Sequence, residues 1–202
     1  MSIFHPRQPR IPNHLRGQRK VLDAFRALPA ETRVFVRVQL PDPEATGVLD
    51  LDLLVADHDL GLVIVNVLAD GVERREGHWV CRTADGDCER LAISPADALQ
   101  AQQNALFKFL KGAGLPFVPR ITQVLALPLF PLEPGRALGP NLPACRLLTE
   151  EKLRNPYISL RLAVTGGKPW NEWSATPTAS QFGIGGETME RLAGALGEVL
   201  PA

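Results

Sequence analysis

The sequence predicts an α/β fold in which a mixed central sheet of four to five strands is flanked by helices. Apolar and polar residues alternate, or nearly alternate, over residues 34–38 and 49–55, as they do in strands with one buried face. Residues 62–68 are apolar except for Asn66, which is typical of a central strand covered on both faces. Segments before and after these strands have apolar residues at helical spacing instead.

The sequence of the N-terminal part predicts an extended arm followed by a helix. Residues 1–15 are rich in proline and arginine, which favours an extended conformation. Over residues 16–28 apolar side chains recur at helical spacing, and Pro29 then stops the helix. The first 20 residues contain no acidic residue, so this region is either a solvated basic segment or a phosphate-binding patch. Its candidate nucleic-acid contacts are Arg7, Arg10, Arg16 and Arg19.

A hairpin and a long helix are predicted after the central strand. The hairpin lies between residues 71 and 87 and turns at an Asp-Gly pair. The helix begins at Ser94-Pro95, because serine caps a helix and proline fits its first position. Its inward stripe includes Gln103, and a buried amide without a partner would cost about 1–3 kcal/mol. We therefore expect Gln103 to meet a hydrogen-bonding partner or a wet cleft.

The last third of the chain predicts shorter elements. Residues 124–132 resemble a buried strand broken by two prolines, residues 145–148 a short strand, and residues 149–153 the start of a helix. A loop-rich tail then leads to a final helix with periodic apolar residues that include Leu192 and Leu196. The expected organisation is an arm over 1–15, a main domain over 16–153 and a C-terminal extension over 154–202.

Composition narrows the function classes. Lys plus Arg equals Asp plus Glu at 22 each, so the whole molecule has no net attraction to nucleic acid or to an anionic membrane. The three cysteines contain no pair at metal-ligand spacing, which favours reduced thiols and a cytoplasmic location. No apolar run approaches the roughly 18 residues that a membrane span requires, and we expect no membrane partner.

The order of the predicted elements and motifs resembles the NERD domain, a nuclease-related domain found alone or fused to bacterial helicase and kinase modules. The resemblance spans residues 16–153, about two thirds of the chain, and lies in the order of its pieces more than in any one of them. It implies the PD-(D/E)xK, restriction-endonuclease-like core. The matching stretches are Arg16-Gly17-Gln18, Leu51-Asp52-Leu53-Leu54-Val55, Gly61-Leu62-Val63-Ile64-Val65, Gly77-His78-Trp79, and Pro95 followed by Gln100-Ala101 and Asn104.

The resemblance also implies a lost activity. In such nucleases two acids on adjacent strands hold a divalent cation, and a lysine two residues after the second acid steadies the attacking water. Here Asp52 remains as a weak metal ligand, whereas Asn66 and Leu68 occupy the positions of the second acid and the lysine. Gln18 replaces a glutamate that the family usually has on its first helix. Hard cations prefer anionic oxygen, so magnesium or manganese is expected only if cleavage survives.

Three functions remain open at this point. The first is a degenerate nuclease domain that binds DNA or RNA, or a helicase-type or other DNA-processing protein. The second is an active nuclease with relocated ligands, and the third is a protein-interaction or structural module. Gln100 and Gln103 are further candidate site residues, with an ordinary helix surface as the alternative. The candidates for relocated ligands are Asp57, Asp59, Asp70 and Glu73, with Lys108 or Lys111 in place of the lysine.

Overall fold

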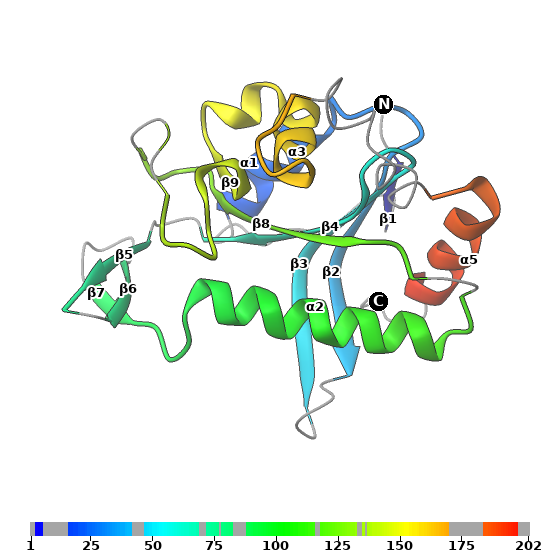
Figure 1. Ribbon diagram of the computed structural model, residues 1–202, viewed down its shortest axis with the longest axis horizontal. Coiled ribbons are helices and arrows are strands. Elements are labelled where there is room, and N and C mark those ends of the chain that lie inside the picture. The colour runs from blue at the N-terminus through cyan, green and yellow to red at the C-terminus, as the bar shows by residue number, and fades with distance from the viewer. Residues whose placement is uncertain are drawn as a thin grey trace.

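A computed structural model shows one mixed six-stranded sheet with helices on both faces and a separate three-stranded sheet (Figure 1). It describes residues 3–5, 16–41, 47–68, 72–76, 78–82, 88–115, 118–132, 135, 137–169 and 184–197. The α/β class predicted from the sequence is confirmed. Four long strands make up the middle of the sheet, and a three-residue strand is added at each edge.

The elements have the following bounds. The helices are α1 (Arg16–Phe25), α2 (Pro95–Gly112), α3 (Pro156–Val164) and α5 (Gly186–Gly197), with 3-10 turns η1 (Ala144–Arg146) and η2 (Lys152–Arg154). The main sheet has the order β1 (Ile3–His5), β2 (Arg33–Pro41), β3 (Val48–Asp57), β4 (Gly61–Val67), β8 (Ile121–Leu127) and β9 (Leu147–Thr149). The small sheet contains β5 (Val72–Arg75), β6 (His78–Arg82) and β7 (Cys88–Arg90).

The main sheet combines an antiparallel meander with parallel additions. β2, β3 and β4 pair antiparallel in sequence order. β8 pairs parallel with β4, and β9 pairs parallel with β8. A parallel pair needs a crossover between its strands, and α2 lies in the crossover between β4 and β8. At the other edge β1 pairs parallel with β2, so residues 3–5 of the expected extended arm belong to the sheet.

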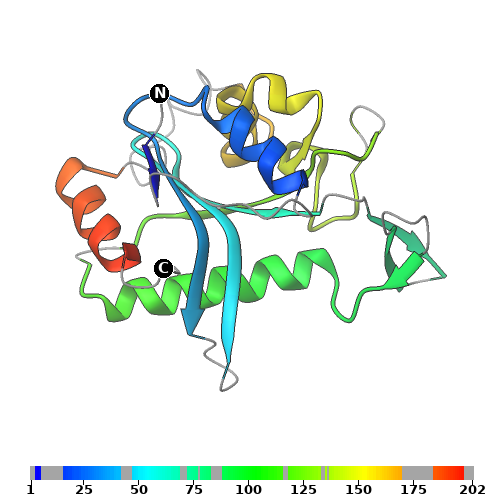
Figure 2. The ribbon, with the colours of Figure 1, turned by 180° about the vertical axis from the view of Figure 1, so that it is seen from behind.

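Two apolar layers enclose the sheet. α2 and α5 cover one face, and α1 and α3 cover the other (Figures 1 and 2). β4 contributes Leu62 and Ile64 to the first layer and Val63 and Val65 to the second. All four side chains are fully buried. The predicted central strand is therefore confirmed, because β4 lies inside the sheet and is covered on both faces.

β2 and β3 reverse their buried faces at the same point. Residues two apart in a regular strand face the same side, yet Val36 packs in the α1 layer and Val38 in the α2 layer. Their paired residues in β3, Leu53 and Leu51, divide in the same way. Between them Arg37 has a φ of 58°, a left-handed conformation that non-glycine residues rarely adopt. The reversal places Asp52, which lies between Leu51 and Leu53, at a break in the regular pleat.

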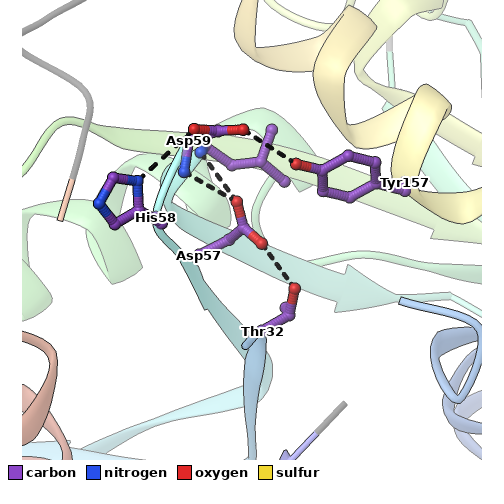
Figure 3. Close-up of polar contacts among 6 residues, drawn as sticks. Thr32, Asp57, His58, Asp59 and Tyr157 are labelled. Carbon is purple, nitrogen blue, oxygen red and sulfur yellow. Dashed lines mark hydrogen bonds and ion pairs between the residues drawn. The ribbon is translucent and has the colours of Figure 1, made fainter. Parts of the chain in front are cut away.

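The turn between β3 and β4 is built around a buried carboxylate (Figure 3). Asp57 is 1% exposed, and its Oδ1 accepts hydrogen bonds from the backbone N–H groups of Asp59 and Leu60 at 2.9 and 3.2 Å. Its Oδ2 accepts a hydrogen bond from Thr32 Oγ1 at 2.5 Å, which ties the turn to the start of β2. Gly61 then takes a φ of 72°, which glycine adopts without a steric penalty.

The same turn contacts helix α3. The Tyr157 hydroxyl donates to Asp59 Oδ2 at 3.4 Å, and the His58 ring lies 3.5 Å from the same carboxylate (Figure 3). Burial raises the pKa of Tyr157 well above its usual range, and the nearby charges of Asp57 and Asp59 raise it further. Tyr157 is therefore a neutral hydrogen-bond donor, and this cluster fixes the position of α3 against the β3–β4 turn.

Several element boundaries differ from the sequence-based expectation. The strand expected over 124–132 is β8, which begins earlier and ends before Pro128, since proline cannot donate a hydrogen bond to a neighbouring strand. The short strand expected over 145–148 is the 3-10 turn η1 followed by β9, and the helix start expected over 149–153 is the 3-10 turn η2. The stretch expected to be loop-rich contains helix α3, which packs in the same apolar layer as α1.

In the described ranges no helix is long and apolar enough to cross a membrane.

Candidate functional site

The structure brings Gln18 and Asp52 into direct contact. Gln18 lies on the buried face of α1, and its Nε2 donates a hydrogen bond to Asp52 Oδ1 on β3. The backbone N–H of Val67 donates to Asp52 Oδ2 at 2.7 Å. Gln18 and Asp52 are 34 positions apart in the sequence, and the motif resemblance predicted both as site residues. This cluster on the α1 face is the candidate functional site.

The strand geometry explains why the Asp52 carboxylate binds the Val67 N–H. The regular β3–β4 ladder ends at the pair Leu53 and Val65. Because β3 reverses its face next to this pair, the Asp52 carboxylate turns toward α1. Beyond the end of this ladder, the carboxylate accepts a hydrogen bond from the N–H of Val67 on β4. An unpaired backbone donor at a partly buried position is costly, so Asp52 satisfies a structural requirement of the sheet.

The environment of Asp52 disfavours its negative charge. Burial raises the pKa of Asp52 above its ordinary value of 3.8, and the nearby charge of Asp50 raises it further. The hydrogen bonds from Val67 and Gln18, and the positive charge of Arg37, act in the opposite direction without cancelling the effect of burial. Gln18 Oε1 is buried and has no hydrogen-bond partner in the described part of the chain. The site is therefore a partly desolvated pairing of one carboxylate with neutral amides.

These residues do not fit a magnesium or manganese site. Each Asp52 oxygen already faces an N–H donor, whereas a hard cation needs several oxygen ligands around it. Gln18 turns its donor nitrogen toward Asp52, and Asp50 is exposed to solvent. Among the described residues no group of three or more His, Cys, Asp or Glu side chains is arranged to hold a metal ion. The donor set supports pairing of Asp52 with amides rather than activation of water by a metal.

Asn66 and Leu68 do not share a face with the partners of Asp52. Leu62, Ile64 and Leu68 pack in the α2 layer, and side chains alternate along β4, so Asn66 also belongs to the α2 side. Val65 and Val67 are the residues of this segment that pack in the α1 layer. The structure therefore places two apolar side chains, rather than Asn66 and Leu68, on the same face of the sheet as the Gln18 and Asp52 pair.

The candidates for relocated ligands lie away from Asp52. Asp57 and Asp59 belong to the turn at the far end of β3, and the Asp57 carboxylate is already bonded there. Glu73 lies on β5 in the separate small sheet. Lys108 and Lys111 are exposed on α2, which covers the opposite face of the main sheet. Asp70 is outside the described residues.

The glutamines of α2 form a second polar cluster on the opposite face of the sheet. Gln103 Nε2 donates to the Ile121 carbonyl oxygen at 3.3 Å, and Gln103 Oε1 accepts from Gln123 Nε2 at 2.5 Å. The expectation that Gln103 meets hydrogen-bonding partners is thus confirmed. Gln100 is exposed, bonds Asn104 at 3.1 Å, and lies 3.5 Å from Gln123 Nε2.

Two members of this cluster were not predicted from the sequence. Gln123 is 8% exposed in the middle of β8, and its Nε2 also donates to the Leu99 carbonyl oxygen at 3.1 Å. Gln102 is 6% exposed and donates to the Asp50 carbonyl oxygen at 2.8 Å. The signal for Gln123 in the sequence was an amide next to an apolar strand, which needs a partner when it is buried. Together these amides attach α2 to β8 and β3.

Two exposed basic residues of α1 are close in the sequence to Gln18, the site residue on the same helix. Arg16 and Arg19 are exposed, while Gln18 between them is 9% exposed and turned inward. Lys20 pairs with Glu150 at 2.7 Å. Arg7 and Arg10 are outside the described residues.

The contacts around Asp52 connect α1 with β3 and β4. Comparison of the chain with family models, with curated proteins and with solved structures gives no match.

Proposed function

We propose that this chain is a nuclease-related domain that has lost metal-dependent cleavage and binds nucleic acid, or a partner protein in DNA processing. The observation that carries the proposal is the contact between Gln18 on α1 and Asp52 on β3. The resemblance to the NERD domain assigns these two positions to one active site. In support of it, α1, β2, β3, β4, the small hairpin sheet and α2 follow each other in the order on which the resemblance rests.

Loss of cleavage follows from the chemistry of the retained residues. Hydrolysis of a phosphodiester by a metal site requires anionic ligands that hold the ion and a bound water of lowered pKa. Asp52 is one partly buried carboxylate whose oxygens face N–H donors, and the neighbouring β4 side chains on its face are valines. An amide, a carboxylate and two valines can bind and pack, but they supply no second anionic ligand.

The exposed arginines of α1 supply the binding surface in this proposal. The whole chain is electrically neutral, so any attraction to phosphates must come from a local concentration of positive charge. Arg16 and Arg19 point away from the core on the helix that also carries Gln18. We include Arg7 and Arg10 in this surface on sequence grounds, because they precede α1 in the same acid-free segment.

Charge reversal at Arg16 and Arg19 should weaken nucleic-acid binding. Fluorescence anisotropy with single- and double-stranded DNA and RNA should show affinity falling by about tenfold or more for the Arg16→Glu, Arg19→Glu double variant. The slope of log affinity against log salt should fall by about one for each phosphate that the variant no longer neutralises. Adding Arg7→Glu and Arg10→Glu should weaken binding further. The matched control reverses two exposed arginines elsewhere, Arg90→Glu and Arg191→Glu, and should leave affinity within about twofold.

A cleavage assay on the same substrates in magnesium and manganese separates the alternatives. No cleavage combined with salt-sensitive binding is the expected result. Cleavage that disappears in the Asp52→Asn variant would show an active nuclease and overturn the proposal. Absence of binding to every substrate at low salt would remove the nucleic-acid role.

A further inference from the structure

A second site is indicated by a cavity of about 390 Å³ on the α2 face of the sheet, opposite Asp52. It lies between the first turns of α2, the middle of β8 and the segment that leads into η1. Its size falls in the range of small-molecule sites, which is roughly 300–1,000 Å³. The side chains that matter here are Gln123, Arg146, Asp97 and the two prolines Pro140 and Pro143, all of which line the cavity.

The orientation of the Gln123 amide is fixed by its neighbours. Its Nε2 lies 3.1 Å from the Leu99 carbonyl oxygen, which can only accept a hydrogen bond. The Gln103 amide is fixed in the same way, because its Nε2 donates to the Ile121 carbonyl oxygen and its Oε1 must then face Gln123. Gln123 cannot rotate its amide without placing two acceptors against each other. Its Oε1 accepts no hydrogen bond within the described part of the chain and remains an acceptor for a ligand.

Arg146, which also lines the cavity, supplies a positive charge. It is partly buried, and its guanidinium makes no hydrogen bond or ion pair to any residue that the structure describes. Burial lowers the pKa of the nearby Arg120, and the positive charge of Arg146 lowers it further. A partly buried arginine that lies near a second guanidinium and has no carboxylate partner among the described residues is a favourable partner for an anion.

The cavity is therefore lined both by hydrogen-bond acceptors and by a positive charge, which come from different elements. The Asp97 carboxylate accepts a hydrogen bond from the Ser94 hydroxyl at 2.6 Å and lies, with Gln123, on the side of α2 and β8. A ligand that fits must place hydrogen-bond donors toward these acceptors and an anionic group toward Arg146. Pro140 and Pro143 also line the cavity and offer apolar rings against which a flat group can pack.

We propose that this cavity binds a nucleoside monophosphate unit, with the phosphate on Arg146 and an amino group of the base on Gln123 Oε1. A nucleotide carries an anion, a flat ring and a ring amino group in one molecule of suitable size. The preference for a nucleotide over other bipolar anions rests on the proposed nucleic-acid function. The site itself is independent of Asp52, since the two lie on opposite faces of the sheet.

Isothermal titration calorimetry with adenosine, cytidine and uridine 5′-monophosphates tests this site. Adenosine and cytidine monophosphates carry a ring amino group and should bind with Kd below about 1 mM. Uridine monophosphate presents a carbonyl oxygen to Gln123 Oε1 instead and should bind about tenfold more weakly or worse, because neither oxygen can donate. Inorganic phosphate tests whether an anion alone is enough for binding. Free glutamine tests whether a small bipolar molecule without a base is enough.

The Arg146→Ala variant should weaken the binding of adenosine and cytidine monophosphates by about tenfold or more, the usual cost of removing a charge-assisted hydrogen bond. Arg154→Ala is the matched control, because Arg154 lines a different cavity beside η2 and should leave the binding unchanged. Both variants should unfold at nearly the same temperature as the unmodified chain.

Four results would overturn the site: no binding of any monophosphate, equal binding of uridine monophosphate, equal binding of phosphate or glutamine alone, or an unchanged affinity in Arg146→Ala. Failure here is distinguishable from failure of the proposed function. Oligonucleotide binding that depends on Arg16 and Arg19 would survive the loss of this cavity. Mononucleotide binding that depends on Arg146 would survive the absence of oligonucleotide binding.

Discussion

Replacing Asp57 with alanine is expected to lower the free energy of unfolding by about 3 kcal/mol or more, since a hydrogen bond to a charged group contributes about 1.5–3 kcal/mol. The carboxylate is 1% exposed and accepts hydrogen bonds from Thr32 and from the backbone of Asp59 and Leu60. Alanine would leave these three donors without a partner at or near the buried β3–β4 turn. Urea denaturation followed by circular dichroism would measure the loss.

The control for this prediction is Asp57→Asn. Asparagine keeps one acceptor oxygen for the two backbone N–H groups, and its amide can donate to the Thr32 hydroxyl, which is able to accept as well. Asparagine also favours turns of this type. We expect a loss of about 1 kcal/mol, the typical net value of one neutral hydrogen bond. Equal losses for alanine and asparagine would mean that the carboxylate does not organise the turn.

Replacing Asp52 with alanine is expected to cost about 2–3 kcal/mol, because Gln18 Nε2 and the Val67 N–H would both lose their acceptor. Asp52→Asn should cost much less. Asparagine can still accept a hydrogen bond from the Val67 N–H. Once the Gln18 amide turns over, the asparagine amide can also donate to Gln18 Oε1, which at present has no partner among the described residues. Thermal and urea unfolding of the two variants would measure the difference. A large loss in Asp52→Asn would indicate a requirement for the negative charge itself.

Comparison of the unmodified chain with the Asp52→Asn variant is expected to show a pH dependence of stability with a definite sign. Burial raises the pKa of Asp52 in the folded chain above the ordinary value of 3.8. At a pH between the unfolded pKa and the folded pKa, the folded state therefore binds a proton that the unfolded state has released. This contribution to stability is fully present below the unfolded pKa and is lost as the pH rises through the folded pKa. The unmodified chain should therefore gain stability relative to Asp52→Asn as the pH is lowered from about 7 to about 4. A relative loss over this range would contradict the buried environment of Asp52.

The parts of the fold that were predicted from the sequence are those in which one local signal agrees with the packing. β4 was predicted because an apolar run suits a strand with two covered faces, and α2 because Ser94 and Pro95 mark its first turn. Helix α3 was missed because Ile158 and Leu162 are exposed, 58% and 36%, on a helix whose other face is buried, so its apolar residues show no clear period. The start of β8 was missed because Thr122 and Gln123 are polar and yet buried.

The candidate site was predicted only in part, for two physical reasons. The proximity of Gln18 to Asp52 came from the resemblance, because no local pattern connects a helix residue with a strand residue so distant in the sequence. The placement of Asn66 beside Asp52 also came from the resemblance, and it would require β3 to keep a regular alternation. The left-handed conformation of Arg37 lies where β2 and β3 reverse their faces, and an arginine gives no sequence signal for such a conformation. The glutamine cluster depends on contacts between α2 and β8 that only the three-dimensional structure defines.

The antiparallel meander of β2, β3 and β4 has a consequence for protein synthesis on the ribosome. Within the meander each strand pairs with its neighbour in sequence, so these antiparallel pairings are available as soon as residue 67 has left the exit tunnel. Its parallel partner β8 and the helix α2 are translated later. Until α2 arrives, the face that carries Leu62 and Ile64 is open, and exposed apolar surface of this kind attracts chaperones or other nascent chains. Among the described helices, α2 is thus the first to emerge that can protect the half-made sheet on this face.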